Sequence, residues 1–213
     1  MQIQYIAHAT FTIDLSDGRR IIIDPYLGMS FQGRFNYPSY PTKADFAVIT
    51  HDHLDHNYLG DICNIPVVIR NNWHDDRLDI RTITVFHDKF GGTKFGGTVG
   101  MKIIQADNIR LCHMGDCGEI LSDDQIALLG PLDILLIPVG GFYTIDGDEA
   151  AALAKRINAT TIIPCHYITP RCSLKLEGPE RFLSHFDRVH KLSDSKFNAE
   201  CLPAGVVWVP SLY

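Results

Sequence analysis

The sequence predicts an α/β fold in which β-sheets are covered by α-helices, four layers deep. Short strands fill the first quarter of the chain, whereas helices and strands alternate further on. The chain has 213 residues, of which 46% are hydrophobic, and this is enough to bury one sizeable core. We therefore expect residues 1–213 to form a single domain.

The N-terminal quarter has the pattern of an antiparallel meander. Ser16-Asp17-Gly18 has the composition of a hairpin turn between the second and third strands. A long segment, residues 29–44, combines polar and aromatic side chains with glycine and proline, and we expect a functional or mobile loop there. The expected strands are residues 3–7, 10–15 and 19–24.

The rest of the chain alternates between the two kinds of element. Ser122 is placed as the N-cap of a helix that ends near residue 129, with Gln125 at the capping-box position. The glycine-rich residues 91–97 lack the ending of a phosphate loop, so we expect a flexible turn or tight backbone packing there. We also expect helices at 57–62, 148–158 and 179–186, and strands at 67–70, 82–86, 99–105, 109–113, 133–138, 161–164 and 205–209.

Composition limits the class of function. A net charge of −6 argues against a broad nucleic-acid surface, because such surfaces need Lys and Arg to neutralise phosphates. No apolar run is long enough for a membrane span, and the N-terminus lacks the pattern of a signal peptide. The expected location is therefore cytoplasmic, with reduced and mostly buried thiols at Cys63, Cys112, Cys117, Cys165, Cys172 and Cys201.

The most informative feature is the run His51-Asp52-His53-Leu54-Asp55-His56, which follows the apolar residues 45–50. In an extended chain, residues two apart face the same way, so His51 and His53 can bind one ion. Asp55 and His56, one turn further on, can reach a second ion. A solvated polar loop would be the simpler explanation for an isolated pair of histidines, but this density of ligands favours a binuclear metal site.

Three more acidic or imidazole side chains directly follow expected strands. They are His87, Asp116 and His166. With His51 and His53, His87 would complete a three-histidine site. Asp55, His56 and His166 would form the second site, with Asp116 bridging both ions.

These residues carry a family resemblance. The pattern T-H-x-H-x-D-H at residues 50–56, followed by H-D-x-x-G-G, G-D and a late P-x-H-Y, resembles the metallo-β-lactamase-fold hydrolase superfamily across nearly the whole chain. The segments Ile137–Gly141 and Pro164–Tyr167 resemble the branch that includes ascorbate-6-phosphate lactonase-like and N-acyl-phosphatidylethanolamine phospholipase D-like proteins. The resemblance implies an αββα sandwich with the site at one edge of its two sheets.

The resemblance also bears on residues near the ligands. The third histidine could be His87 or His113, and we favour His87 because its H-D-x-x-G-G context resembles the motif of the branch. His113 then lies behind the ligands or contacts substrate. Asp24 is expected to accept a hydrogen bond from a ligand imidazole, and His8 to contact substrate, to donate a proton or to have no special role. Tyr143 and Tyr167 are candidates for the pocket wall.

The expected activity is metal-dependent hydrolysis of a small ester, lactone or phosphodiester. Two divalent ions, zinc or alternatively manganese or iron, would hold a bridging hydroxide, with Asp55 and Asp116 as catalytic residues that orient it and accept its proton. The chain has no G-x-S-x-G motif for a serine mechanism. Two alternatives stay open: a non-hydrolytic metal-binding or regulatory protein, and an RNA-processing nuclease. A small molecule is the expected partner, and the sequence leaves the oligomeric state open.

Overall fold

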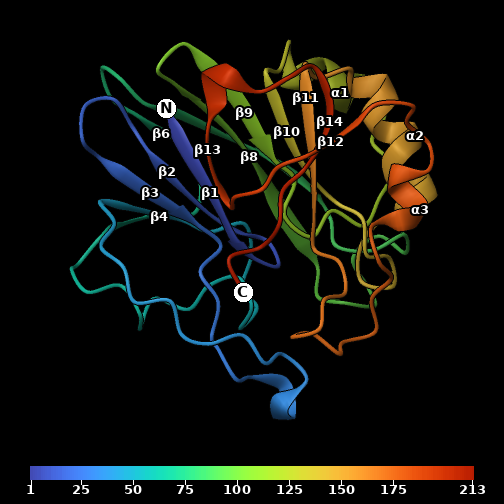
Figure 1. The fold of residues 1–213 in the computed structure, drawn as a ribbon, viewed down its shortest axis with the longest axis horizontal. Helices are drawn as coiled ribbons and strands as arrows, with labels where there is room; N and C mark the ends of the chain where they lie inside the picture. Colours follow the sequence, from blue (N-terminus) through green and yellow to red (C-terminus); the bar gives the residue numbers. More distant parts are fainter.

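The computed structural model describes residues 1–213 and contains two mixed β-sheets that face each other (Figure 1). The first sheet has six strands in the order β13-β1-β2-β3-β4-β5. Its first pairings are antiparallel, and β3, β4 and β5 are parallel. The bounds are β1 Gln2–Ala7, β2 Thr10–Asp14, β3 Arg20–Ile23, β4 Phe46–Val48, β5 Val67–Ile69 and β13 Lys196–Asn198.

The second sheet has eight strands in the order β12-β14-β11-β10-β9-β8-β7-β6. Strands β6 to β9 pair antiparallel, whereas β9 to β12 along this order pair parallel. The bounds are β6 Trp73–His74, β7 Asp79–Phe86, β8 Thr98–Ala106, β9 Ile109–His113, β10 Ile134–Pro138, β11 Thr161–Cys165, β12 Val189–Lys191 and β14 Gly205–Trp208.

Strand alternation explains how the sheets bury their faces. Ile21 and Ile23 of β3 point into the main core between the sheets, whereas Ile22 points to the opposite face of the first sheet. The main core also includes the wholly apolar β10, whose five residues are all buried. A run buried on both faces is typical of a central parallel strand.

The three α-helices all lie beyond the second sheet (Figure 1). They are α1 Asp123–Leu129, α2 Gly147–Ile157 and α3 Glu180–Leu183. The predicted capping box of α1 is confirmed, because the Ser122 hydroxyl accepts from the Gln125 amide while the Gln125 side chain accepts from the Ser122 amide. Helix α2 has the same motif at Asp146 and Glu149.

The outer face of the first sheet has no helix. Ile22 and Ala47 are covered there by Tyr40, Leu59 and Ile62, which come from irregular segments. The fourth layer therefore consists of loops, and the predicted helix at 57–62 is wrong. The backbone of this region pairs with other segments instead, since Tyr58 donates to Pro25 and residue 62 forms a bridge with Thr42.

One further expectation needs correction, and the short strands β6, β12 and β13 were not predicted. Helix α3 is confined to four residues of the predicted 179–186. The sequence also gave no signal for β13, which returns from the C-terminal region to pair with β1 through Ile3 and Phe197. Its residues Lys196-Phe197-Asn198 follow a charged turn, so the strand depends on the partner sheet rather than on its own pattern.

Cys112, Cys117, Cys165 and Cys172 are buried, as predicted for most of the thiols, whereas Cys63 and Cys201 are exposed. None of the helices is long and apolar enough to cross a membrane.

Candidate metal centre

Seven predicted ligands converge where strands of both sheets end. They come from four separate stretches of chain: the segment after β4 (His51, His53, Asp55 and His56), the end of β7 (His87), the loop after β9 (Asp116) and the end of β11 (His166). The structure divides them, together with His8, into two adjoining groups of possible ligand atoms, each within 4.8 Å of one another. All except His53 are buried.

The first group contains His51, His53, His87 and Asp116. His53 Nδ1 lies 3.0 Å from His51 Nε2 and 3.3 Å from His87 Nε2. Asp116 Oδ2 lies 3.5 Å from His87 Nε2 and 3.8 Å from His51 Nε2. Ligands about 2.05 Å from a tetrahedral zinc ion are separated by about 3.3 Å, so these donor atoms have the spacing of one ion's coordination shell.

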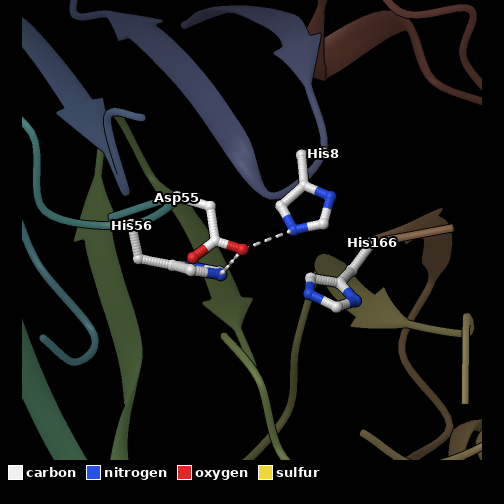
Figure 2. A group of neighbouring side chains, drawn as sticks. All are labelled: His8, Asp55, His56 and His166. Atoms are coloured by element: carbon white, nitrogen blue, oxygen red, sulfur yellow. Dashed lines mark hydrogen bonds and ion pairs between the residues drawn. The ribbon is translucent and has the colours of Figure 1, made fainter. Parts of the chain in front are cut away.

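The second group contains Asp55, His56, His166 and also His8, whose side chains point toward a common centre in Figure 2. Asp55 Oδ2 lies 3.2 Å from His8 Nε2 and 3.8 Å from His56 Nε2. Asp116 links the two groups, because its Oδ1 lies 3.1 Å from His56 Nε2 and its Oδ2 lies 3.1 Å from His166 Nε2.

Hydrogen bonds on the far sides of the rings fix which nitrogens face inward. Asp24 accepts from the Thr50 amide and hydroxyl and lies 2.9 Å from His56 Nδ1. Since the Thr50 hydroxyl donates to Asp24, His51 Nδ1 must donate to Thr50, at 2.9 Å. His87 Nδ1 similarly faces the carbonyl of Tyr143, at 3.2 Å. Each of these rings is thereby left with a lone pair on Nε2 that points into the cluster.

Two of the inward-facing atoms have no hydrogen bond in the protein. His56 Nε2 and Asp116 Oδ1 are buried and face each other at 3.1 Å, but neither makes a hydrogen bond. Buried polar atoms without a partner are costly, and converging imidazole lone pairs repel one another. A cation among them removes both penalties, so the donor set fits divalent metal ions.

Electrostatics agrees with this fit. Burial and, to a lesser extent, the neighbouring His56 together lower the pKa of His51 to about 3, so His51 is neutral as a ligand must be. Burial alone would lower the pKa of His56, but the carboxylates of Asp116 and Asp55 raise it well above its ordinary value. Burial would raise the pKa of Asp116, yet His166 and His56 hold it well below its usual range. The carboxylates thus attract positive charge into the cluster.

The backbone around the site is unusual. His8, Asp24 and His166 all have positive φ, at 57°, 47° and 51°. Residues other than glycine adopt this region only when the surrounding structure requires it, and such positions gather at functional sites. Gly115 also has positive φ, and a Cβ there would lie 2.8 Å from the Thr50 hydroxyl. Glycine therefore permits the tight turn that carries Asp116 to the cluster.

His113 lies outside both groups of ligand atoms. Its Nε2 donates to the carbonyl of Ala9 at 2.7 Å, and its Nδ1 accepts from the amide of Gly115 at 2.9 Å. Both ring nitrogens are therefore used within the fold, and the ring is completely buried. The geometry leaves no free nitrogen on His113 for an ion and places His87 in the cluster instead.

The two tyrosines differ in position. Tyr143 lines the cavity beside the ligands. Tyr167 does not line it, because it is buried in the main core and its hydroxyl accepts from Trp208 Nε1 at 3.1 Å. The positive φ of His166 turns the chain there, so the two neighbouring side chains enter different surroundings.

The sequence did not reveal the role of Asp88. Its buried carboxylate accepts hydrogen bonds from the amides of Phe90, Gly92, Lys94 and Phe95, and so organises the glycine-rich segment as a tight loop. Four amide donors outweigh burial and lower the pKa of Asp88. The spacing of residues does not predict these four hydrogen bonds. The only sequence feature that pointed to them was an acidic residue shortly before a glycine-rich run.

The same loop lies against two ligands. The His87 amide donates to the carbonyl of Gly97 at 3.0 Å. At Gly96, with φ of 119°, a Cβ would lie 3.1 Å from His53 Nε2. Tight backbone packing, one of the two predicted possibilities for this segment, is what the structure shows.

A cavity of about 360 Å³ opens over the cluster. Its wall combines apolar and aromatic side chains with polar ones, a composition common in small-molecule sites. The lining residues are Phe31, Arg34, Asp52, His53, Leu54, Asp55, Asn57, His87, Phe95, Asp116, Tyr143, His166 and Leu174.

Comparison with known proteins extends these observations. Residues 2–166 match the beta-lactamase superfamily domain family. Relatives named UPF0173 metal-dependent hydrolase include one from Caldivirga maquilingensis, 28% identical over 203 residues that cover 78% of this chain and 82% of the relative. Another, from Archaeoglobus fulgidus, is 28% identical over 207 residues that cover 79% of this chain and 84% of the relative.

Among solved structures, the chain is similar to a proposed zinc-dependent hydrolase of the metallo-β-lactamase superfamily from Thermotoga maritima. The TM-score is 0.79 and the identity 28%, covering 98% of this chain and 97% of that one. The predicted fold class, an α/β fold of the metallo-β-lactamase type, is confirmed.

Proposed function

This chain belongs to the beta-lactamase superfamily, and from that premise we propose that it is a metal-dependent hydrolase with a binuclear site. Its relatives named metal-dependent hydrolases support the same assignment. The single observation that carries the proposal is the convergence of buried imidazole nitrogens and carboxylate oxygens within 4.8 Å of one another, with His56 Nε2 and Asp116 Oδ1 left without a hydrogen bond.

Seven residues would hold the two ions. His51, His53 and His87 surround one position, Asp55, His56 and His166 surround the other, and Asp116 contacts both groups. Divalent ions bound there supply Lewis acidity and lower the pKa of water toward neutrality.

The chain's own residues supply orientation and proton acceptance. Asp116 presents Oδ1 to His56 and Oδ2 to both His87 and His166, so its carboxylate lies between the two positions and contacts both groups. Asp55 is held by His8 Nε2, at 3.2 Å from Oδ2, which limits rotation of its carboxylate. We assign Asp55 and Asp116 as the residues that orient the attacking oxygen and accept its proton, because both remain ionised.

The finer proposal concerns substrate and metal. A small ester, lactone or phosphodiester fits a cavity of about 360 Å³ with a polar floor and partly apolar walls. The resemblance of residues 137–141 and 164–167 to the lactonase-like and phospholipase D-like branch supports the same substrates. Zinc is the metal we propose, since three imidazoles and a carboxylate at tetrahedral spacing suit it, and manganese or iron would accept the same ligands.

The decisive experiment is elemental analysis of the purified chain, alongside His53→Ala, Asp55→Ala and a matched control, His74→Ala, at an exposed histidine far from the cluster. We expect about two ions per chain in the parent and in the control, with loss in each of the other variants. The same preparations are then assayed on a panel of esters, lactones and phosphodiesters.

A parent that binds no zinc, manganese or iron overturns the proposal. A parent that binds two ions but hydrolyses nothing on the panel favours the non-hydrolytic alternative, a metal-binding or regulatory protein on the same fold.

A further inference from the structure

The cavity has one cationic side chain in its wall, and that side chain is unpaired. Arg34 lines the cavity together with the metal-ligand residues. Its Nε donates to the carbonyl of Phe31 at 3.3 Å, while its two terminal nitrogens have no acceptor in the protein. Most other arginines hold a carboxylate, namely Arg19, Arg20, Arg70, Arg81, Arg156 and Arg181.

The backbone holds Arg34 firmly although its side chain is exposed. The carbonyl of Arg34 accepts from the Ser173 amide at 2.7 Å, and the next residue, Phe35, pairs with Cys172. Phe35 is fully buried, and its ring packs edge-on against His8, with centroids 5.0 Å apart. The guanidinium is thus presented from an anchored loop rather than from a free one.

Two further unpaired cations lie beside the same cavity. Lys94 Nζ lies 4.9 Å from the ring centroid of Phe95, which lines the cavity. Lys175 Nζ lies 4.1 Å from the ring centroid of Phe142, and the Phe142 ring packs against Tyr143. Neither lysine forms an ion pair with a carboxylate, in a chain whose net charge is −6. Three cationic side chains without a carboxylate partner therefore lie in or beside this cavity, whose wall also contains the carboxylates of Asp52, Asp55 and Asp116.

We propose that Arg34 binds an oxyanion of the substrate that is distinct from the group hydrolysed at the cluster. This rests on the proposed function and narrows it to esters, lactones or phosphodiesters that carry a second carboxylate or phosphate. The planar guanidinium can hold such a group through two parallel N–H···O bonds. The apolar side chains of Phe31 and Leu174 border the same space and would contact the carbon chain between the two groups.

The test compares dicarboxylates from malonate to adipate with monocarboxylates of the same carbon number. Binding to the zinc-loaded full chain is measured by calorimetry for the parent, Arg34→Ala, Arg34→Lys and Arg188→Ala. Arg188 is an exposed, unpaired arginine outside the cavity, so its variant controls for the loss of one charge. Zinc content is determined before and after each titration.

At the best-fitting length, the second carboxylate should raise affinity roughly tenfold in the parent and in Arg188→Ala. The gain should vanish in Arg34→Ala and be smaller in Arg34→Lys, because lysine cannot bind in the two-pronged manner. An equal gain in Arg34→Ala, or no gain at any length in the parent, overturns this proposal while intact zinc binding leaves the metal centre standing. A parent that binds none of zinc, manganese or iron overturns both.

Discussion

The proposed metal ligands at the floor of the cavity are almost all buried, whereas the loops at its mouth, residues 29–36, 88–97 and 171–177, are largely exposed. At the floor, the rings of His51, His56 and His87 are each fixed by a hydrogen bond on the far side, to Thr50, Asp24 and the carbonyl of Tyr143. At the mouth, Arg34, Lys94 and Lys175 have no carboxylate partners. Under the proposed function, this difference separates chemistry from recognition: buried side chains with fixed orientations form the floor, and cations without carboxylate partners lie at the mouth, where a ligand would bind.

The largest expected effect tests the floor. Asp116→Asn keeps the shape of the side chain but removes the negative charge that faces both ligand groups. We expect turnover to fall by about 10³-fold, equivalent to about 4 kcal/mol of transition-state stabilisation. The measurement is kcat with saturating metal, on any ester, lactone or phosphodiester that the parent hydrolyses. Asp187→Asn, at an exposed position, is the control, and circular dichroism checks that the fold persists. Undiminished turnover would refute the role assigned to Asp116.

The floor was also the more predictable region, for a physical reason. The proposed ligands in residues 51–56 lie next to one another in sequence, and the others follow strands whose ends meet at one edge, so local spacing and strand order are enough to predict that they converge. Asp24 could be placed for the same reason, since it follows β3 directly.

Features that depend on contacts between segments far apart in the chain could not be predicted from the sequence. Strand β13 exists because β1 offers it an edge, and Tyr167 enters the core because the chain turns at His166. The helix expected at 57–62 is replaced by pairing with residues 25 and 42. Arg34 reaches the cavity only because its loop is anchored to residues 171–173, more than a hundred positions away in the chain.

A second prediction concerns the rigid interior beneath the floor. Lys102 of β8 is fully buried, and its ammonium donates to the carbonyl of Arg70 at 2.6 Å and to the hydroxyl of Thr82 at 3.1 Å. Burial lowers the pKa of Lys102 from 10.5 to about 8, partly opposed by Asp24. The folded state therefore disfavours the charged form of Lys102. Protonation of this side chain lowers the free energy of unfolding, and the whole cost is present below pH 8.

The sign follows from linkage. Between pH 8 and 10.5 the unfolded chain holds a proton on Lys102 that the folded chain releases, so stability rises with pH across this window. Relative to Lys102→Met, which cannot titrate, the parent should gain up to about 3 kcal/mol between pH 7.5 and 10.5. Urea unfolding of the metal-free parent and variant at several pH values measures it. A constant difference between them would show that Lys102 titrates as in the unfolded chain.

The smallest effect is expected for Asp88, in a loop that belongs to the mouth of the cavity and also contacts the floor. Asp88 belongs to a mouth loop, yet that loop contacts His53 through Gly96 and His87 through Gly97. Asp88→Ala leaves four amides without their acceptor, so the loop should loosen and support these two ligands less well. We expect about tenfold weaker binding of one of the two ions, together with faster amide exchange across residues 90–97. Asp187→Ala serves as the control. Weaker metal binding without faster exchange would mean that Asp88 acts on the ligands by charge alone. Faster amide exchange with unchanged metal affinity would instead show that the floor keeps its geometry when the mouth loop loosens. The stability of the mouth loop would then have no effect on metal binding at the floor.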